Sequence, residues 1–275
     1  DQASLPNAFV PTTWSYTNNP AVSGTNVVIN EFSAHYLNGP LLDEDNEQQD
    51  WIELYNRGAS AVRLRGWSLT TDPGQPGLWV FPDRTLNPGQ YLVVFASGKD
   101  RKPTATASNL HTNFRLNEFG EYLGLYRPDL PRIAASEFAP EYPEQRQDIS
   151  YGYTPSGALV YFQTPTPRTA NPESPSYAGL ASMPKASVNS GFFNQPFSLV
   201  LSTESPGATI RYTLNGSSPE TAGIDYTGPI PISGNSAKAV IIVRAVAFKT
   251  GWLPSRTLTH TYVFPEFVLF QPANP

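Results

Sequence analysis

The chain has 275 residues, 28 prolines, 20 glycines and no cysteine, and its net charge at neutral pH is −5. The lack of cysteine excludes disulfides, thiolate nucleophiles and zinc sites with cysteine ligands. The net negative charge provides no basic electrostatic field, so we expect the protein neither to bind nucleic acid nor to insert into a membrane. The length is sufficient for two ordinary domains, each with its own core.

The N-terminal part begins without periodicity. Residues 1–23 are predicted to form an extended arm that Trp14 and Tyr16 fix to the first domain. The first clear strand is expected at residues 26–32, and an irregular acidic segment follows at 35–49.

Residues 50–69 contain two alternating apolar runs that a polar, glycine-containing turn separates. Period-2 alternation predicts paired strands with one buried face. Trp51 before the turn and Trp67 after it give that face a large apolar area.

Short apolar runs between proline and glycine turns continue the first domain. Residues 97–112 and 128–147 are polar or proline-bearing, and they are predicted to be irregular. Further strands are expected at residues 78–81, 91–96, 114–116, 122–126, 148–153 and 158–163.

The stretch at residues 164–175 has too many prolines to pair inside a sheet. A second alternating pattern follows, with strands expected at 196–202, 209–214, 230–232, 239–248 and 258–264 and a tight turn at Asn215–Gly216. We therefore predict an all-β chain of two β-sandwiches. The expected boundaries are an arm at 1–23, a first domain at 24–171, a proline-rich linker at 172–184, a smaller sandwich at 185–264 and a tail at 265–275 that is either an edge strand or the start of a further domain.

Several blocks of the first domain occur in a fixed order: VVINEF at 27–32, DWIELYN at 50–56, LRGWSL at 64–69, WVFP at 79–82, LNPGQYLVVFASGK at 86–99 and LHTNFRLNEFGEYLGLY at 110–126. They resemble the lamin-tail domain, an immunoglobulin-like sandwich of nuclear lamins and of bacterial exported proteins. TPTPRTAN at 164–171 is similar to the closing stretch of that family.

The second domain contains IRYTLNGSSPE at 210–220, YTGPIPI at 226–232 and VRAVAFKTGWLPS at 243–255. These blocks resemble the small sandwich found at the C-terminus of chitobiases, whose fold is of the immunoglobulin or fibronectin-III type. That family usually carries aspartate where this chain has Asn215, so a cation bound there is in doubt. The two resemblances together imply the front part of a larger exported protein and no catalytic activity for either domain.

An acidic cluster precedes the central strand: Asp43, Glu44, Asp45, Glu47 and Asp50. Clustered carboxylates with loop carbonyls can coordinate Ca²⁺, so we predict Asp43, Asp45 and Asp50 as metal ligands. The alternative is a solvated acidic loop in which Asp50 hydrogen-bonds to local backbone.

Other candidates for chemistry are weaker. The three histidines share no ligand-spaced motif. Glu31 and Glu53 lie in strands that are expected to be neighbours, and a carboxylate pair is the apparatus of glycoside hydrolysis. The sequence gives no sign of a sugar cleft, so we interpret both as outward strand residues near Arg63 or Arg65 and predict no catalytic residue.

Aromatic side chains offer a second type of function. Trp14, Trp79, Trp252 and the 14 tyrosines could stack on sugar rings, provided that a coplanar pair is exposed. Our first hypothesis is therefore a non-catalytic adhesion, spacer or binding segment of a larger protein outside the cell or on its surface, with a protein or polysaccharide ligand. The alternative is an accessory carbohydrate-binding part of a polysaccharide-degrading enzyme whose catalytic domain lies elsewhere.

Overall fold

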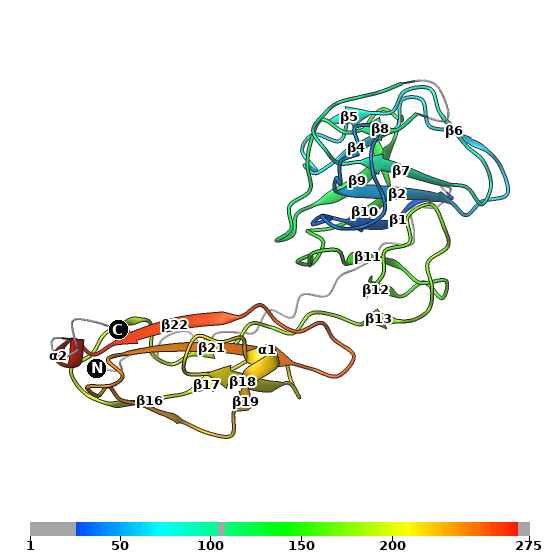
Figure 1. The fold of residues 1–275 in the computed structure, drawn as a ribbon. Helices are drawn as coiled ribbons and strands as arrows, with labels where there is room; N and C mark the ends of the chain where they lie inside the picture. Colours follow the sequence, from blue (N-terminus) through cyan, green and yellow to red (C-terminus); the bar gives the residue numbers. More distant parts are fainter. Residues whose placement is uncertain (1–25, 104–107, 269–275) are drawn as a thin grey trace, which may run out of the picture. The chain divides into compact units, whose positions relative to one another are not determined.

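The computed structural model describes residues 26–103 and 108–268, and it divides the chain into two compact units, Asp1–Ser174 and Pro175–Pro275. The predicted arm at 1–23, with Trp14 and Tyr16, and residues 269–275 of the predicted tail lie outside the described residues. Both units are built from β-strands (Figure 1), and the prediction of an all-β chain with two sandwiches is confirmed. No helix among the described residues is long and apolar enough to cross a membrane.

Two main sheets and one short ladder lie in unit 1. Within this unit, the strand order of the larger sheet is β12–β11–β1–β2–β7–β8, and that of the smaller sheet is β10–β9–β4–β5; β3 and β6 form the ladder. The strands are β1 (Val27–Ser33), β2 (Trp51–Asn56), β3 (Val62–Arg63), β4 (Ser68–Thr70), β5 (Trp79–Val80), β6 (Thr85–Leu86), β7 (Tyr91–Phe95), β8 (Leu110–His111), β9 (Leu123–Arg127), β10 (Ile133–Phe138), β11 (Ser150–Tyr153) and β12 (Leu159–Phe162).

The inner face of the larger sheet packs against the smaller sheet. Phe32 of β1 lies opposite Ile52 of β2, and the ring centroids of Phe32 and Phe138 of β10 are 5.1 Å apart. Because side chains alternate along a strand, Leu54 joins Ile52 on this face, and both are fully buried. The odd-numbered residues of β2 therefore point to the opposite face, which we call the outer face.

The prediction that the two halves of residues 50–69 pair with each other is wrong. β2 pairs with β1 and β7, whereas β4 pairs with β5 and β9 in the other sheet. Alternation correctly indicates that each run has a buried face, but it does not identify the hydrogen-bonded partner.

Two strands lie where irregular chain was expected. β8 falls in the polar segment 97–112, and β10 falls in the proline-bearing segment 128–147. β10 has the sequence IAASEF, in which small and polar residues conceal the alternation. The strand predicted at 114–116 is absent, and only an isolated bridge joins Arg115 to Ser97 there.

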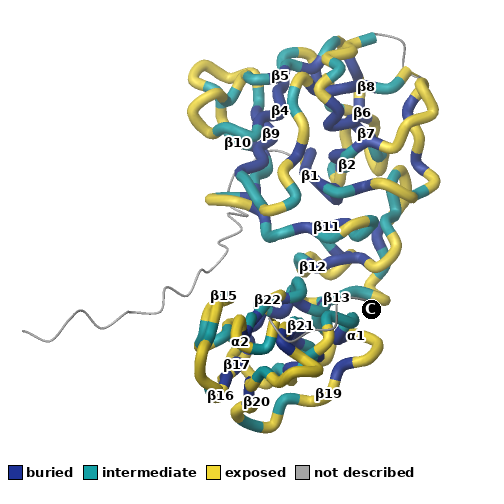
Figure 2. Tube along the Cα trace, turned by 60° about the vertical axis from the view of Figure 1, so that its left-hand side comes forward, coloured by how far each residue is buried: buried dark blue, intermediate teal, exposed yellow. Residues whose placement is uncertain are grey.

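β1 is the buried centre of the larger sheet, and all seven of its residues are buried (Figure 2). A β-bulge shifts its register against β2 between Ile29 and Glu31. Such a bulge places an extra residue on the strand and redirects its side chain. Gly152 of β11 lies against the bulge, where a Cβ atom would be 2.3 Å from the carbonyl oxygen of Asn30, so only glycine permits this approach.

Unit 2 has one larger sheet in the order β15–β22–β21–β18–β19, with two short ladders, β14–β17 and β16–β20. Leu199, Ile232, Val243 and Tyr262 are among its core residues. Its elements are β13 (Ser176–Tyr177), β14 (Lys185–Ala186), β15 (Gly191–Phe192), β16 (Phe197–Leu199), β17 (Leu201–Ser202), β18 (Thr209–Thr213), α1 (Pro219–Ala222), β19 (Ile224–Asp225), β20 (Ile230–Ile232), β21 (Val240–Phe248), β22 (Leu258–Val263) and α2 (Pro265–Val268).

Part of the segment expected to be a linker at 172–184 belongs to unit 2. Ala178 donates its backbone N–H to Gly251, and Ala181 donates to Leu253, at 2.9 Å each. Gly179 lies against the ring of Trp252, where a Cβ atom would come within 2.6 Å of a ring carbon. The chain is therefore fixed to unit 2 well before β14.

Candidate binding site on the outer face of the sheet

The outward residues of β2 lie in three different environments. Trp51 is fully buried and belongs to a cluster with Tyr36 and Leu41 of the connection between β1 and β2. Glu53 is also fully buried, under a segment from the end of the unit. Tyr55 is only half-buried and lines a pocket. The outer face is thus closed at one end and open at the other.

Two glutamates meet in the closed part. Glu31 of β1 is the cross-strand partner of Glu53, and neither side chain is exposed. Asn30, the bulge residue, donates from Nδ2 to Glu53 Oε1 at 3.0 Å. Ser150 of β11 donates its hydroxyl to Glu31. The bulge thus brings the amide of Asn30 and the carboxyl of Glu31 to the same face.

Residues 164–171, which we call the closing segment, cover this pair. Thr166 donates its backbone N–H and its hydroxyl to the two oxygens of Glu31, at 3.0 Å each. Arg168 donates its backbone N–H to Glu53. Its φ of +70° lies in the left-handed region, which is uncommon for a residue other than glycine. We interpret this backbone conformation as the means by which the N–H is directed at the carboxyl.

Burial dominates the ionisation of both carboxyls. It raises the pKa of Glu53 to about 8, and the charge of Glu31 adds to this effect, while the hydrogen bonds from Arg168 and Asn30 oppose it. Burial also raises the pKa of Glu31, against the hydrogen bonds from Ser150 and Thr166. Both carboxyls therefore hold a proton more strongly than an exposed glutamate does.

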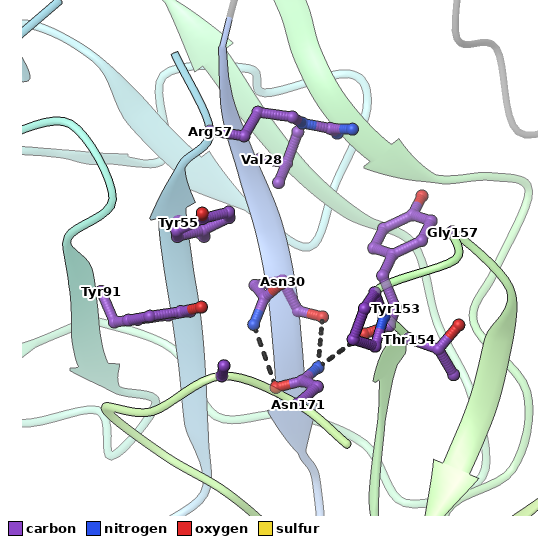
Figure 3. Close-up of a pocket in the computed structure, with 11 residues that line it drawn as sticks. Val28, Asn30, Tyr55, Arg57, Tyr91, Tyr153, Thr154, Gly157 and Asn171 are labelled. Atoms are coloured by element: carbon purple, nitrogen blue, oxygen red, sulfur yellow. Dashed lines mark hydrogen bonds between the residues drawn. The ribbon is translucent and has the colours of Figure 1, made fainter. Parts of the chain in front are cut away.

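The open part of the outer face is a pocket of about 370 Å³. Tyr55 and its cross-strand partner Tyr91 stack with ring centroids 4.5 Å apart and form one wall, and Tyr153 forms the opposite wall (Figure 3). Asn30 and Asn171 lie between these walls and share a hydrogen bond of 3.1 Å from Nδ2 to Oδ1. Because Asn171 ends the closing segment, the buried carboxyls and the pocket belong to one network.

Glu31 and Glu53 lie on the outer face, but the interpretation that they are near Arg63 or Arg65 is wrong, because both are buried under the closing segment. Arg63 pairs instead with the exposed Asp83. The signal that was missed is the closing segment: its prolines exclude it from a ladder, but its remaining N–H groups can still donate to side chains.

The tryptophans considered for sugar binding are not available as a row. Trp79 is fully buried, and Trp14 lies outside the described residues. Trp252 is half-buried in unit 2, where the Lys249 ammonium lies 3.8 Å from its ring centroid. The pocket of unit 1 therefore relies on tyrosines.

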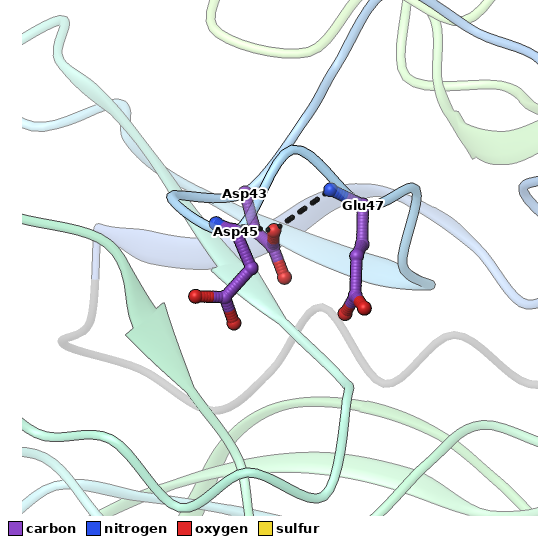
Figure 4. A group of neighbouring side chains, drawn as sticks. All are labelled: Asp43, Asp45 and Glu47. Atoms are coloured by element: carbon purple, nitrogen blue, oxygen red, sulfur yellow. Dashed lines mark hydrogen bonds between the residues drawn. The ribbon is translucent and has the colours of Figure 1, made fainter.

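The predicted metal ligands do not all come together. Asp43 and Asp45 form a group with Glu47, in which ligand atoms lie within 4.8 Å of one another (Figure 4), and Asp50 is not a member of it. The Lys99 ammonium contacts all three carboxylates, at 2.5, 2.6 and 2.8 Å. Lys99 thus supplies positive charge that a calcium ion would otherwise bring, so an ion has to compete with this ammonium for the carboxylates.

Whether the acidic group can bind calcium is tested by removing Lys99, which contacts all three carboxylates in the folded chain. We expect millimolar calcium and EDTA to give the same melting temperature for the unaltered protein, because Lys99 neutralises the cluster. Lys99→Met should lower the melting temperature by several degrees through repulsion among the carboxylates, and calcium should restore part of that loss. Lys102→Met, which removes a contact with the exposed Asp100, serves as the control. A calcium shift in the unaltered protein would show that the ion displaces Lys99.

A serine, a histidine and a glutamate form a chain of hydrogen bonds that the sequence did not indicate. His111 Nδ1 lies 2.8 Å from Ser97 Oγ, and its Nε2 lies 2.9 Å from Glu44 Oε2. Ser97 is only 1% exposed, and its oxygen also accepts from the backbone N–H of Lys99. A nucleophile must reach its substrate, so we interpret this chain as an anchor for the acidic loop.

Residues 20–138 match the family model of the Lamin Tail Domain, and residues 199–262 match the model described as Fn3 associated. The second family is a chitobiase C-terminal-like module, so the matches confirm both resemblances and their order. No curated protein matches the chain. The first match ends before β11, β12 and the closing segment, although the compact unit continues to Ser174.

Proposed function

We propose that this lamin tail domain and its Fn3-associated partner form a non-catalytic binding segment of an exported protein, placed outside the cell or on its surface. Modules of these two kinds are generally accessory rather than catalytic, which supports the proposal. Further domains of a longer parent chain and a ligand at the cell surface are its partners.

The ligand-binding place in this proposal is the tyrosine pocket of unit 1. A concave site with aromatic walls and a few converging polar groups is the usual form of a small-ligand site. The Oδ1 atom of Asn30 accepts no hydrogen bond from the described residues, and the exposed Arg57 offers donors at the rim. Sugar hydroxyls both donate and accept, and the faces of sugar rings pack against aromatic rings. The ligand that we propose is therefore a carbohydrate.

The observation that carries this proposal is the placement of tyrosines on opposite walls, with an unsatisfied amide oxygen between them. We expect the full chain to bind a subset of glycans on an array, and calorimetry to give the affinity for the best of them. Tyr55→Leu and Tyr91→Leu should each weaken that affinity by about tenfold, since an aromatic contact contributes roughly 0.5–1.5 kcal/mol beyond its buried area.

Tyr226→Leu is the matched control, because Tyr226 is a half-buried tyrosine of unit 2 that contacts another ring. It should leave glycan binding unchanged. If no glycan binds, or if binding survives both pocket substitutions, the carbohydrate assignment is wrong and the adhesion or spacer role is favoured instead.

A further inference from the structure

A second pocket lies at the loop end of unit 1, apart from the tyrosine pocket. Three stretches far apart in the sequence line it: residues 34–37 after β1, 48–50 before β2 and 115–119 before β9. It has a volume of about 510 Å³, which is ample for a side chain, and we call it the loop pocket. In immunoglobulin-like sandwiches, loops at one end commonly form the recognition surface.

The carboxyl of Asp50 in this pocket is poorly compensated. Among the described residues, this carboxyl accepts one hydrogen bond: the backbone N–H of Tyr36 donates to Oδ1 at 3.2 Å. Burial raises its pKa to about 6 despite that bond and the positive charges of His35 and Arg115, and the charge of Glu118 acts in the same direction as burial. Burial thus removes water from this carboxyl, and a single hydrogen bond replaces it.

Asp148, which contacts the same loop, is a carboxylate whose loss of water is compensated by several hydrogen bonds. It accepts from the backbone N–H groups of Leu37 and Asn38 at 2.8 and 2.9 Å, and from the side chains of Asn38 and Gln147. Although burial acts against ionisation, these bonds lower the pKa of Asp148 to about 2. The contrast indicates that the loop has donors for one carboxylate but not for Asp50.

The basic groups of the loop pocket are directed at partners other than Asp50. His35 Nδ1 lies 2.7 Å from Glu118 Oε2. Arg115 donates from Nη1 to Gln49 Oε1 at 3.5 Å, at the outer limit of a hydrogen bond. Neither of these basic side chains forms an ion pair with the Asp50 carboxylate.

The rim of the loop pocket is apolar. Leu37 is 52% exposed and Phe119 is 62% exposed, and both line the pocket beside these charges. Long basic side chains combine an apolar stem with a charged head, and such stems pack along apolar surface. The surface thus complements that shape and charge.

We propose that the loop pocket binds a basic side chain of a partner polypeptide, with its ammonium or guanidinium group against Asp50 and its stem against Leu37 and Phe119. The partner is an arginine- or lysine-bearing chain.

The test uses the full chain and N-acetyl-arginine amide as the probe, followed by NMR shifts of the backbone amides of residues 34–37 and 115–119. We expect saturable shifts, with N-acetyl-leucine amide giving none. Asp50→Asn retains an acceptor for Tyr36 and should weaken binding by at least tenfold. Phe119→Ser should weaken it several-fold.

Asp129→Asn is the matched control, because Asp129 is an exposed carboxylate that pairs with Arg127 and does not line the pocket. It should bind like the unaltered protein. Absence of saturable shifts overturns the proposal, and so does equal binding by Asp50→Asn and the unaltered protein. Binding that falls in both aspartate variants would indicate a general charge effect and would also overturn it.

Discussion

A chain that ends at Phe138, where the lamin-tail match ends, is expected to remain unfolded, whereas a chain that ends at Ser174 is expected to fold. The shorter chain lacks β11 and β12, so β1 loses one of its two antiparallel neighbours. It also lacks the buried side chains of Tyr151, Tyr161 and Phe162. Each such burial contributes about 1.5–3 kcal/mol, and domains are typically stable by only about 5–15 kcal/mol.

A chain that ends at Gln163 separates the contribution of β11 and β12 to stability from that of the closing segment. It retains β11 and β12 but removes the donors that Thr166 and Arg168 direct at the two glutamates. Leaving a buried acceptor unsatisfied costs about 1–3 kcal/mol, so we expect a folded but clearly weakened unit. Urea denaturation of the three chains gives the comparison. Equal, cooperative unfolding of the chains ending at 138 and 174 would contradict the extended domain boundary.

The stability of unit 1 is expected to fall as the pH rises from 5 to 8, by about 2–4 kcal/mol. A raised folded-state pKa means that the native state holds a proton that the unfolded state has lost, so stability decreases with pH between the two values. For Glu53 this window runs from 4.5 to about 8. The raised pKa of Glu31 acts in the same direction. Below this window, carboxylates with a lowered pKa such as Asp148 reverse the trend.

Glu53→Gln should reduce this pH dependence, because the amide does not titrate while the carboxyl of Glu31 still does. The variant is expected to be less stable than the unaltered chain at pH 5, since an amide N–H₂ faces either Asn30 or Arg168, which are both donors. Its deficit should shrink toward pH 8. Glu141→Gln, at an exposed glutamate, should retain the full slope. Parallel curves for all three proteins would rule out Glu53 as the titrating group.

The fold class of this chain and its two modules are predictable from the sequence, whereas the pairing of its strands is not. Period-2 alternation is a local property, and it locates β1, β2 and β7 well. Pairing is a long-range property: residues 50–56 and 64–69 lie in different sheets although only a short turn separates them. β10 is missed because pairing with β9, rather than its own β-propensity, holds IAASEF extended.

The tyrosine pocket cannot be predicted from the sequence for the same reason. Tyr55, Tyr91 and Tyr153 come from three strands, and only the register and the bulge at Asn30 bring them around one space. The proline-rich closing segment is recognisable as a boundary, but its N–H groups have a role only once two carboxyls lie beneath it. The acidic cluster, by contrast, is visible in the sequence, while Lys99, the cation that neutralises it, lies some fifty residues away.

Burial of two carboxyls under the closing segment supports both the domain boundary and the floor of the pocket. Carbon-13 NMR of the glutamate carboxyls, followed across pH in the full chain, measures it directly. The predicted result is a Glu53 carboxyl that titrates near pH 8, well above the ordinary value of 4.5, with Glu31 also raised. Titration of both near 4.5 would contradict the closed arrangement and the network that joins it to the pocket.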